Sequence, residues 1–91
     1  GLAQAALGGL PEGTLADAEG LLRAAVALDP DDPFNRYQLA LTLEKQGRPV
    51  EAAAELERAL ARPDREARDR RSRADAEARL RRMGTVDSKR R

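Results

Sequence analysis

Apolar residues recur at helical spacing along the chain, in short stretches that proline and glycine separate. Leu15, Ala18, Leu22 and Ala25 stand at i, i+3, i+7 and i+10, which places them on one face of a helix. Similar stripes follow, made of Leu39, Ala40 and Leu43, then Ala52, Leu56, Ala59 and Leu60. The pattern predicts an all-α fold of short helices, with the three central ones over about residues 15–28, 33–46 and 49–62.

The predicted helix ends carry residues that favour helix termination or capping. Thr14 with Asp17 forms a capping-box pattern, and Asp32 before Pro33 is a favourable N-cap. Gly47 follows the 33–46 helix, where a left-handed residue ends many helices. The turn from Gly47 to Pro49 is short, so the helices on either side are expected to lie antiparallel.

A last helix is predicted over residues 64–83, with Asp64 as its cap, Gly84 at its end and a possible break near Ser72. Ala76, Leu80 and Met83 stand at i, i+4 and i+7 and are expected to dock on the preceding helices. Its outer face is charged, with acid-before-base pairs at i, i+4: Glu66–Arg70, Asp69–Arg73, Asp75–Arg79 and Glu77–Arg81. We interpret residues 64–84 as a charged capping helix and residues 85–91 as a disordered basic tail.

Residues 13–28 align with residues 47–62 at a spacing of 34, which pairs Gly13 with Gly47 and Leu22 with Leu56. The chain therefore resembles the tetratricopeptide repeat family, whose repeat is helix, turn, helix. Matching positions of residues 29–62 are Leu39, Ala40, Leu43, Gly47, Ala52, Leu56 and Ala59. The resemblance covers roughly residues 10–63, with repeats over 14–63 and a degenerate first helix and turn over 1–13.

The sequence also departs from this family in three places. Arg36 stands where the family prefers Trp, and Pro49 where it prefers a large side chain, so looser packing between the two helices is expected. From Asp64 onward a third repeat would place Arg70 and Arg73 at core positions. No third repeat is therefore predicted.

Composition excludes most catalytic chemistry. Of the 91 residues, 41% are apolar, dominated by 18 Ala and 13 Leu, and the chain has three Val and no Ile or Trp, which leaves little material for a sheet. There is no Cys and no His, so thiolate chemistry, imidazole catalysis and Cys/His zinc sites are absent. We expect no enzyme activity, no catalytic residue, no cofactor and no metal site.

The candidate functional residues lie on one face of the 33–46 helix. Phe34, Tyr37, Leu41 and Glu44 stand at i, i+3, i+7 and i+10, away from the core set of that helix. The family resemblance implies that this face lines a concave peptide-binding groove, to which Gln38 and Lys45 add polar contacts. The alternative is that Phe34 and Tyr37 are buried against the preceding helix. The Lys, Asn and Arg clamp for a terminal carboxylate is not supported, because Tyr37, Gln38 and Leu41 occupy those positions.

The predicted function is a non-catalytic protein-protein interaction or assembly module, with a protein or peptide partner. Self-association is a second possibility, through the apolar N-terminal residues Leu2, Ala5, Ala6, Leu7 and Leu10. Nucleic-acid binding by the arginine-rich end is a less favoured alternative: residues 64–91 hold eleven bases, but six interleaved acids and no aromatic residue. A further alternative is an accessory domain of a larger enzyme or a thioredoxin-like chaperone.

The net charge of +1 hides an uneven distribution, with residues 1–35 acidic and residues 64–91 basic. No apolar run approaches the ~20 residues of a membrane span. We therefore expect a soluble chain without membrane contact, with the cytoplasm slightly favoured. The chain begins at Gly1 rather than Met, which is compatible with a piece of a longer protein.

Overall fold

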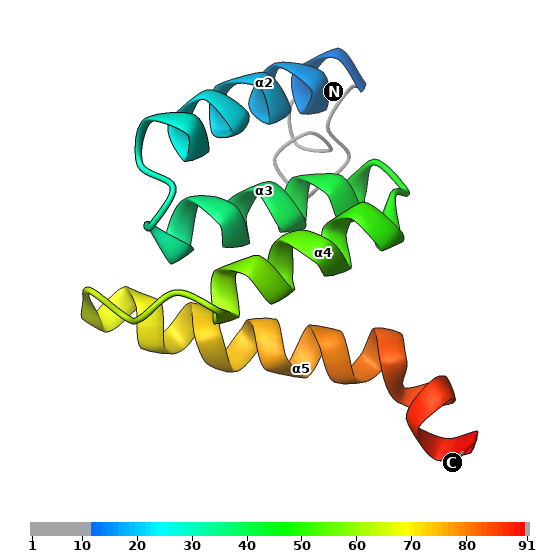
Figure 1. Ribbon diagram of the computed structural model, residues 1–91. Coiled ribbons are helices and arrows are strands. Elements are labelled where there is room, and N and C mark those ends of the chain that lie inside the picture. The colour runs from blue at the N-terminus through cyan, green and yellow to red at the C-terminus, as the bar shows by residue number, and fades with distance from the viewer. Residues whose placement is uncertain (1–11, 91) are drawn as a thin grey trace.

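A computed structural model describes the backbone of residues 12–90 and the side chains of residues 13–84. This part of the chain contains four helices and no strand: α2 (Glu12–Leu28), α3 (Pro33–Lys45), α4 (Pro49–Leu60) and α5 (Ala67–Arg90). Consecutive helices run in opposite directions and stack in chain order (Figure 1). The predicted all-α, antiparallel helix-turn-helix fold is confirmed, while the predicted helix over residues 2–8 and the apolar N-terminal residues lie outside the described part.

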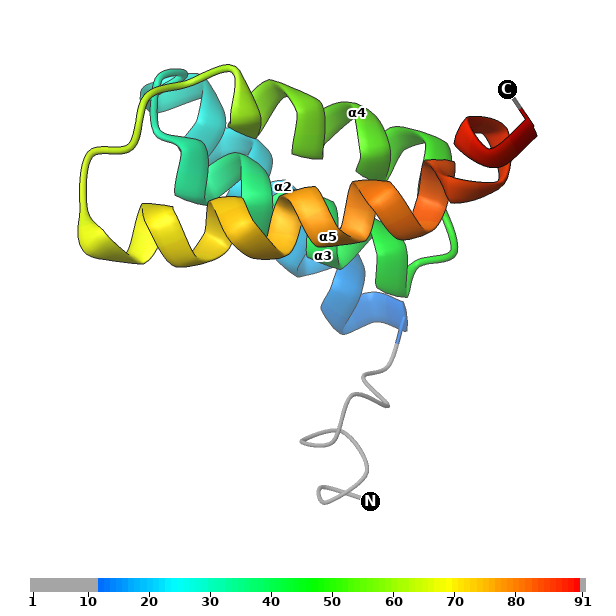
Figure 2. The same cartoon turned by 90° about the horizontal axis from the view of Figure 1, so that it is seen from below.

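The predicted core residues of α3 and α4 are buried. Leu39, Leu43 and Ala52 form one cluster, against which Leu22 and Val26 of α2 pack. Ala40 and Leu56 form a second cluster with Ala76 of α5, and Leu60, Leu80 and Met83 pack around it. Helix α5 thus docks on both α3 and α4, as Figure 2 shows from below, and the predicted docking residues Ala76, Leu80 and Met83 are confirmed.

At two of the predicted helix boundaries, the residues expected to cap or end the helix do so in the structure. Asp32 caps α3, since its Oδ1 accepts a hydrogen bond from the backbone N–H of Phe34 at 2.9 Å, and Pro33 occupies the first turn. Gly47 has a φ of 76°, a left-handed conformation that costs glycine little and a residue with a Cβ more. The short connection from α3 to α4 depends on this residue.

Other predicted boundaries are wrong. Helix α2 begins at Glu12, so Thr14 lies within the helix rather than at its cap. Helix α5 begins at Ala67, and Asp64 does not cap it: the Asp64 carboxylate pairs with Arg73 at 2.9 Å. Asp69 performs the capping instead, because its Oδ2 accepts the backbone N–H groups of Arg65 and Glu66 at 2.7 and 3.0 Å.

Helix α5 is continuous through Ser72 and extends past Gly84 to Arg90, although its end was expected at Gly84. Its ion pairs also differ from the predicted set. Among the side chains that the structure describes, Asp75–Arg79 forms as predicted at 2.6 Å, whereas Arg73 pairs with Asp64 and Asp69 is occupied by its capping bonds. The division into residues 1–13, 14–63, 64–84 and 85–91 remains a prediction.

At the position where the family prefers Trp, Arg36 bridges α3 and α4 by charge. Its Nη1 lies 3.4 Å from Oε1 of Glu55, a residue that is buried, and its Nε donates to the carbonyl of Pro30 at 3.2 Å. Arg58 reaches the other oxygen of Glu55 at 2.7 Å. Two arginines therefore compensate the buried carboxylate, and a polar contact replaces the expected aromatic one.

A second polar cluster holds α2 to the turn between α3 and α4. Glu19 accepts hydrogen bonds from Arg23 and Arg48, both at 2.8 Å, and from the Gln46 amide at 3.2 Å. The bonds from Arg23 and then Arg48 lower the pKa of Glu19 from 4.5 to about 2. Because the folded pKa lies below the unfolded value, Glu19 stabilises the fold above pH 4.5, and this contribution disappears as the pH falls toward 2.

We therefore expect Glu19→Gln to make the thermal unfolding midpoint less sensitive to acid. The variant should unfold at a lower temperature than the parent chain at about pH 7, and the two midpoints should converge as the pH approaches about 2. Circular dichroism melts across this range measure the difference. If the thermal unfolding midpoints of both chains fell by the same amount as the pH was lowered, Glu19 would not hold α2 in this way.

Candidate functional site

The candidate site lies where α3 and α5 meet, beside the buried cluster of Ala40, Leu56 and Ala76, against which Tyr37 packs. We call it the α3–α5 face, made of the six predicted residues Phe34, Tyr37, Gln38, Leu41, Glu44 and Lys45 of α3, and of Arg68, Arg71, Asp75, Arg79 and Arg82 of α5. The α5 residues recur at helical spacing on one side of that helix. The face therefore combines a mostly uncharged α3 with an arginine-rich α5.

A hollow of about 260 Å³ opens on this face between the two helices, lined by Phe34, Tyr37, Arg68, Arg71 and Ser72. The two aromatic rings lie 6.2 Å apart, tilted by 38°. The guanidinium of Arg68 stacks over Phe34 at 4.3 Å from the ring centroid, within range of a cation–π attraction. The hollow thus has an aromatic floor and an arginine rim, a combination suited to a side chain of a partner rather than to a small polar metabolite.

A chain of polar contacts joins α3 to α5 beside the hollow. The Tyr37 hydroxyl donates to Oδ2 of Asp75 at 2.5 Å, Arg79 binds the same oxygen at 2.6 Å, and Arg79 also pairs with Glu44. Burial, followed by this bond to Asp75, raises the pKa of Tyr37. The bonds from Tyr37 and Arg79 lower the pKa of Asp75, and the charge of Arg82 contributes to this effect. Asp75 is therefore held in its ionised form.

The six predicted groove residues have different environments in the structure. Phe34 and Tyr37 lie together in the hollow, and Glu44 is engaged by Arg79. Gln38 and Leu41 are half-buried on the same side of α3, and Lys45 is exposed. Phe34 and Tyr37 make their cation–π and hydrogen-bond contacts with α5 rather than with the preceding helix, while Tyr37 also packs against the core cluster of Ala40, Leu56 and Ala76.

Sequence reasoning missed the half of this face that α5 contributes. The sequence pattern predicts a charged outer face for this helix and marks Ser72 only as a possible break in it, whereas Arg68, Arg71 and Ser72 line the hollow with Phe34. The signal that could have found them was the helical spacing of Arg68, Asp75, Arg79 and Arg82, which share one side of α5. That spacing identifies them as site residues only when the side of α5 that faces α3 is known.

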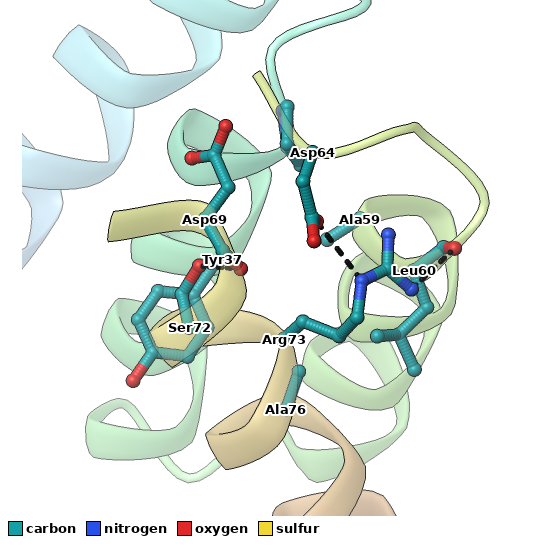
Figure 3. Close-up of a pocket in the computed structure, with 9 residues that line it drawn as sticks. Tyr37, Ala59, Leu60, Asp64, Asp69, Ser72, Arg73 and Ala76 are labelled. Carbon is teal, nitrogen blue, oxygen red and sulfur yellow. Dashed lines mark hydrogen bonds and ion pairs between the residues drawn. The ribbon is translucent and has the colours of Figure 1, made fainter. Parts of the chain in front are cut away.

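A smaller, partly open cavity lies between α3, α4 and α5 (Figure 3). Arg73 lines it and bonds Asp64 and the carbonyls of Leu60 and Arg62, at the C-terminal end of α4. Its volume of about 10 Å³ is close to the minimum for a single water molecule. This cavity can hold no substrate or cofactor, and the contacts around it are structural.

A larger hollow, about 410 Å³, lies on another side of α5, between α5 and α4. It is lined mainly by apolar residues, among them Val50, which is 82% exposed, Ala53, Leu80 and Met83. In stacked helical repeats an apolar surface of this kind packs against a neighbouring helix. Among the described residues that line this hollow, Glu57 is the one charged residue, so the hollow lacks the convergent polar groups of a binding site.

The described residues contain no cluster of three or more acidic residues arranged to hold a metal ion. Within the same part of the chain, no helix has the length and apolar content needed to cross a bilayer. The chemistry of the α3–α5 face is therefore that of aromatic, amide and charged side chains.

Comparison with known proteins gives one family match and one curated relative to set beside this geometry. The sequence model of the family described as tetratricopeptide repeat matches residues 10–80, well beyond residue 63, where the sequence pattern placed the end of the resemblance. The cytochrome c-type biogenesis protein CycH of Rhizobium meliloti (strain 1021) is 43% identical over 58 residues, covering 55% of this chain and 15% of the relative. No solved structure matches the chain.

Proposed function

The chain belongs to the tetratricopeptide repeat family, and from this premise we propose that it is a non-catalytic module that binds a segment of a partner protein on its α3–α5 face. Members of this family serve in general as protein-interaction and assembly modules. The hollow of Phe34, Tyr37, Arg68, Arg71 and Ser72 is the observation that supports this location, because it is the place where an aromatic surface meets convergent polar groups.

The state of the hydroxyl groups on this face supports a non-catalytic role. The Ser72 hydroxyl donates to the backbone carbonyl of Asp69 at 3.2 Å, and the Tyr37 hydroxyl donates to the ionised Asp75. Neither is activated by a neighbouring base, since the sequence has no histidine and the Asp75 carboxylate is already engaged by Arg79. Binding of a partner, unlike catalysis, does not require an activated hydroxyl group.

A peptide-display selection on the 91-residue chain tests the proposal. Peptides that bind the chain should lose at least about tenfold in affinity for Phe34→Ala, because the variant removes the floor of the hollow. Val50→Ala removes an apolar side chain that is 82% exposed in the α4–α5 hollow and should change affinity by less than about twofold. Fluorescence anisotropy measures both, and circular dichroism confirms that each variant is folded.

The opposite pattern, in which Val50→Ala abolishes binding and Phe34→Ala does not, would place the site in the α4–α5 hollow and contradict the proposal. So would a selection that yields no binding peptide from a folded chain. Equal losses in the two variants would also count against it, because the effect would then not depend on the α3–α5 face.

We also propose that the protein containing this chain takes part in the biogenesis of c-type cytochromes. The support is the identity of 43% over 58 residues to a protein named for that process, although the chain spans 15% of the relative. A chimaera of the relative that carries this chain in place of the matching residues should restore c-type cytochromes to a strain lacking the relative, as detected by haem staining. Loss of c-type cytochromes despite normal levels of the chimaera would contradict this role.

A further inference from the structure

The arginines of α5 fall into two groups on opposite sides of the helix, and the groups differ in their surroundings. On the side facing α3, Arg68 covers Phe34 and Arg79 binds Glu44 and Asp75. Arg71 and Arg82 lie on this side as well: Arg71 lines the hollow, and the charge of Arg82 acts on Asp75. By helical spacing, Arg70 and Arg81 point to the other side of α5.

Positive charge on the α3–α5 face exceeds what its own acids compensate. Both acids, Glu44 and Asp75, are engaged by Arg79. Arg71 and Arg82 are exposed and form no ion pair with any side chain that the structure describes, and the same is true of Lys45 at the end of α3. Within the described chain, the face therefore offers cationic groups whose charge is not used internally.

From this arrangement we propose that the α3–α5 face recognises an acidic, extended segment of a partner protein, with Arg71 and Arg82 binding its carboxylates and the aromatic hollow taking an apolar side chain. This inference rests on the proposed function and specifies the chemistry of the partner. Arginine suits the role, because its planar guanidinium binds carboxylates with two parallel hydrogen bonds.

The geometry of α5 also sets the spacing of the recognised acids. Arg71 and Arg82 are three helical turns apart, about 16 Å along the axis at 1.5 Å per residue. An extended peptide advances about 3.3 Å per residue and points successive side chains to opposite faces, so acidic residues four positions apart face the same way, about 13 Å apart. The long arginine side chains span the remaining ~3 Å. Residues between them would lie over Tyr37 and the half-buried Leu41.

An acidic protein segment fits this face better than a nucleic acid does. Phe34 and Tyr37 are the two aromatic residues of the sequence and Arg68 already occupies one face of the Phe34 ring, so the α3–α5 face offers no series of rings on which successive bases could stack. The ionised carboxylates of Glu44 and Asp75 lie among the arginines, where they would repel a continuous phosphate backbone. A peptide can place neutral residues opposite them.

The test is a titration of the ¹⁵N-labelled 91-residue chain, followed by NMR, with a synthetic peptide blocked at both ends. The peptide has glutamate at its second and sixth positions and leucine or alanine between them, and a second peptide has glutamine in place of both glutamates. The glutamate peptide should shift the amide resonances of α3 and α5, and the glutamine peptide should bind at least about tenfold more weakly. Because the C-terminus of each peptide is amidated, a terminal carboxylate cannot contribute to the binding of either one.

Two double variants with the same change in net charge locate the effect. Arg71→Ala with Arg82→Ala should weaken binding of the glutamate peptide at least about tenfold. The matched control, Arg70→Ala with Arg81→Ala, removes two exposed arginines from the other side of α5 and should change binding by less than about twofold. Circular dichroism melts establish that both variants remain folded.

Three results would overturn the inference. Equal losses in the two double variants would show attraction by net charge alone, and an oligothymidine that binds more tightly than the glutamate peptide through Arg71 and Arg82 would identify a nucleic-acid surface. If the glutamine peptide binds this face as well as the glutamate peptide does, the requirement for acid fails while the proposed interaction module stands. If display selection yields no peptide that depends on Phe34, the proposed function itself fails.

Discussion

Replacing Leu56 with alanine is expected to unfold the chain. Leu56 is fully buried and contacts Ala40 of α3 and Ala76 of α5, so its side chain joins three helices. Its fully buried neighbours in this cluster are both alanines, which cannot extend into the space that the substitution leaves. The expected loss in the free energy of unfolding is about 2–5 kcal/mol, comparable to the whole stability of a small helical domain.

Urea unfolding followed by circular dichroism measures this loss. The matched control is Leu21→Ala, which removes the same atoms from a side chain that is 75% exposed on α2 and should change stability by less than about 0.5 kcal/mol. Similar stabilities for the two variants would mean that Leu56 does not join α3, α4 and α5 as described.

Replacing Asp69 with alanine is expected to detach the beginning of α5. Asp69 is 2% exposed and accepts the backbone N–H groups of Arg65 and Glu66, which would otherwise be unsatisfied at the helix start. Its carboxylate also lies 3.7 Å from Arg68, the residue that covers Phe34. We expect a loss of about 1–3 kcal/mol in stability, together with faster hydrogen exchange in the first turns of α5.

Glu77→Ala is the control for this substitution. Glu77 is an exposed acid of the same helix, without an ion pair to the described side chains, so its removal should cost less than about 0.5 kcal/mol. If Asp69→Ala were no more destabilising than Glu77→Ala, the cap would be unimportant. Asp69→Asn, whose amide oxygen can still accept the two bonds, should retain much of the stability.

The sequence predicted the fold well where local rules and packing agree. Asp32, Pro33 and Gly47 mark helix ends through backbone chemistry that operates over a few residues, and the stripe of Leu39 and Leu43 has the spacing of a buried face. These features do not depend on which helices become neighbours. They could therefore be predicted from a single sequence.

The start of α5 could not be predicted in the same way. The sequence predicts no third repeat, because such a repeat would place Arg70 and Arg73 at core positions. In the structure the buried positions of α5 are held by Asp69, Ser72 and Ala76. Asp69 is buried because it caps its own helix, and Arg73 is satisfied by carbonyls at the end of α4. At the start of α5, polar residues with specific hydrogen-bond partners therefore occupy buried positions, which a search for apolar residues at helical spacing does not find.

For a related reason, the sequence predicts the α3 half of the candidate site but not the α5 half. The helical spacing on α3 places Phe34 and Tyr37 on one face, and this requires no knowledge of tertiary structure. The contributions of Arg71 and Asp75 depend on the docking of α5 against α3, which brings together residues more than thirty positions apart. Such long-range contacts follow from the packing of Ala76 and its neighbours in the core.

The most direct test of the central claim is an NMR measurement of contacts between the chain and the glutamate peptide described above. Phe34 and Tyr37 are the sole aromatic residues of the sequence, so their ring protons are unambiguous reporters of the α3–α5 face. The account predicts intermolecular Overhauser effects from the leucine methyl groups of the peptide to both rings. Contacts of those methyl groups with Val50 and Met83, and none with the two rings, would contradict it.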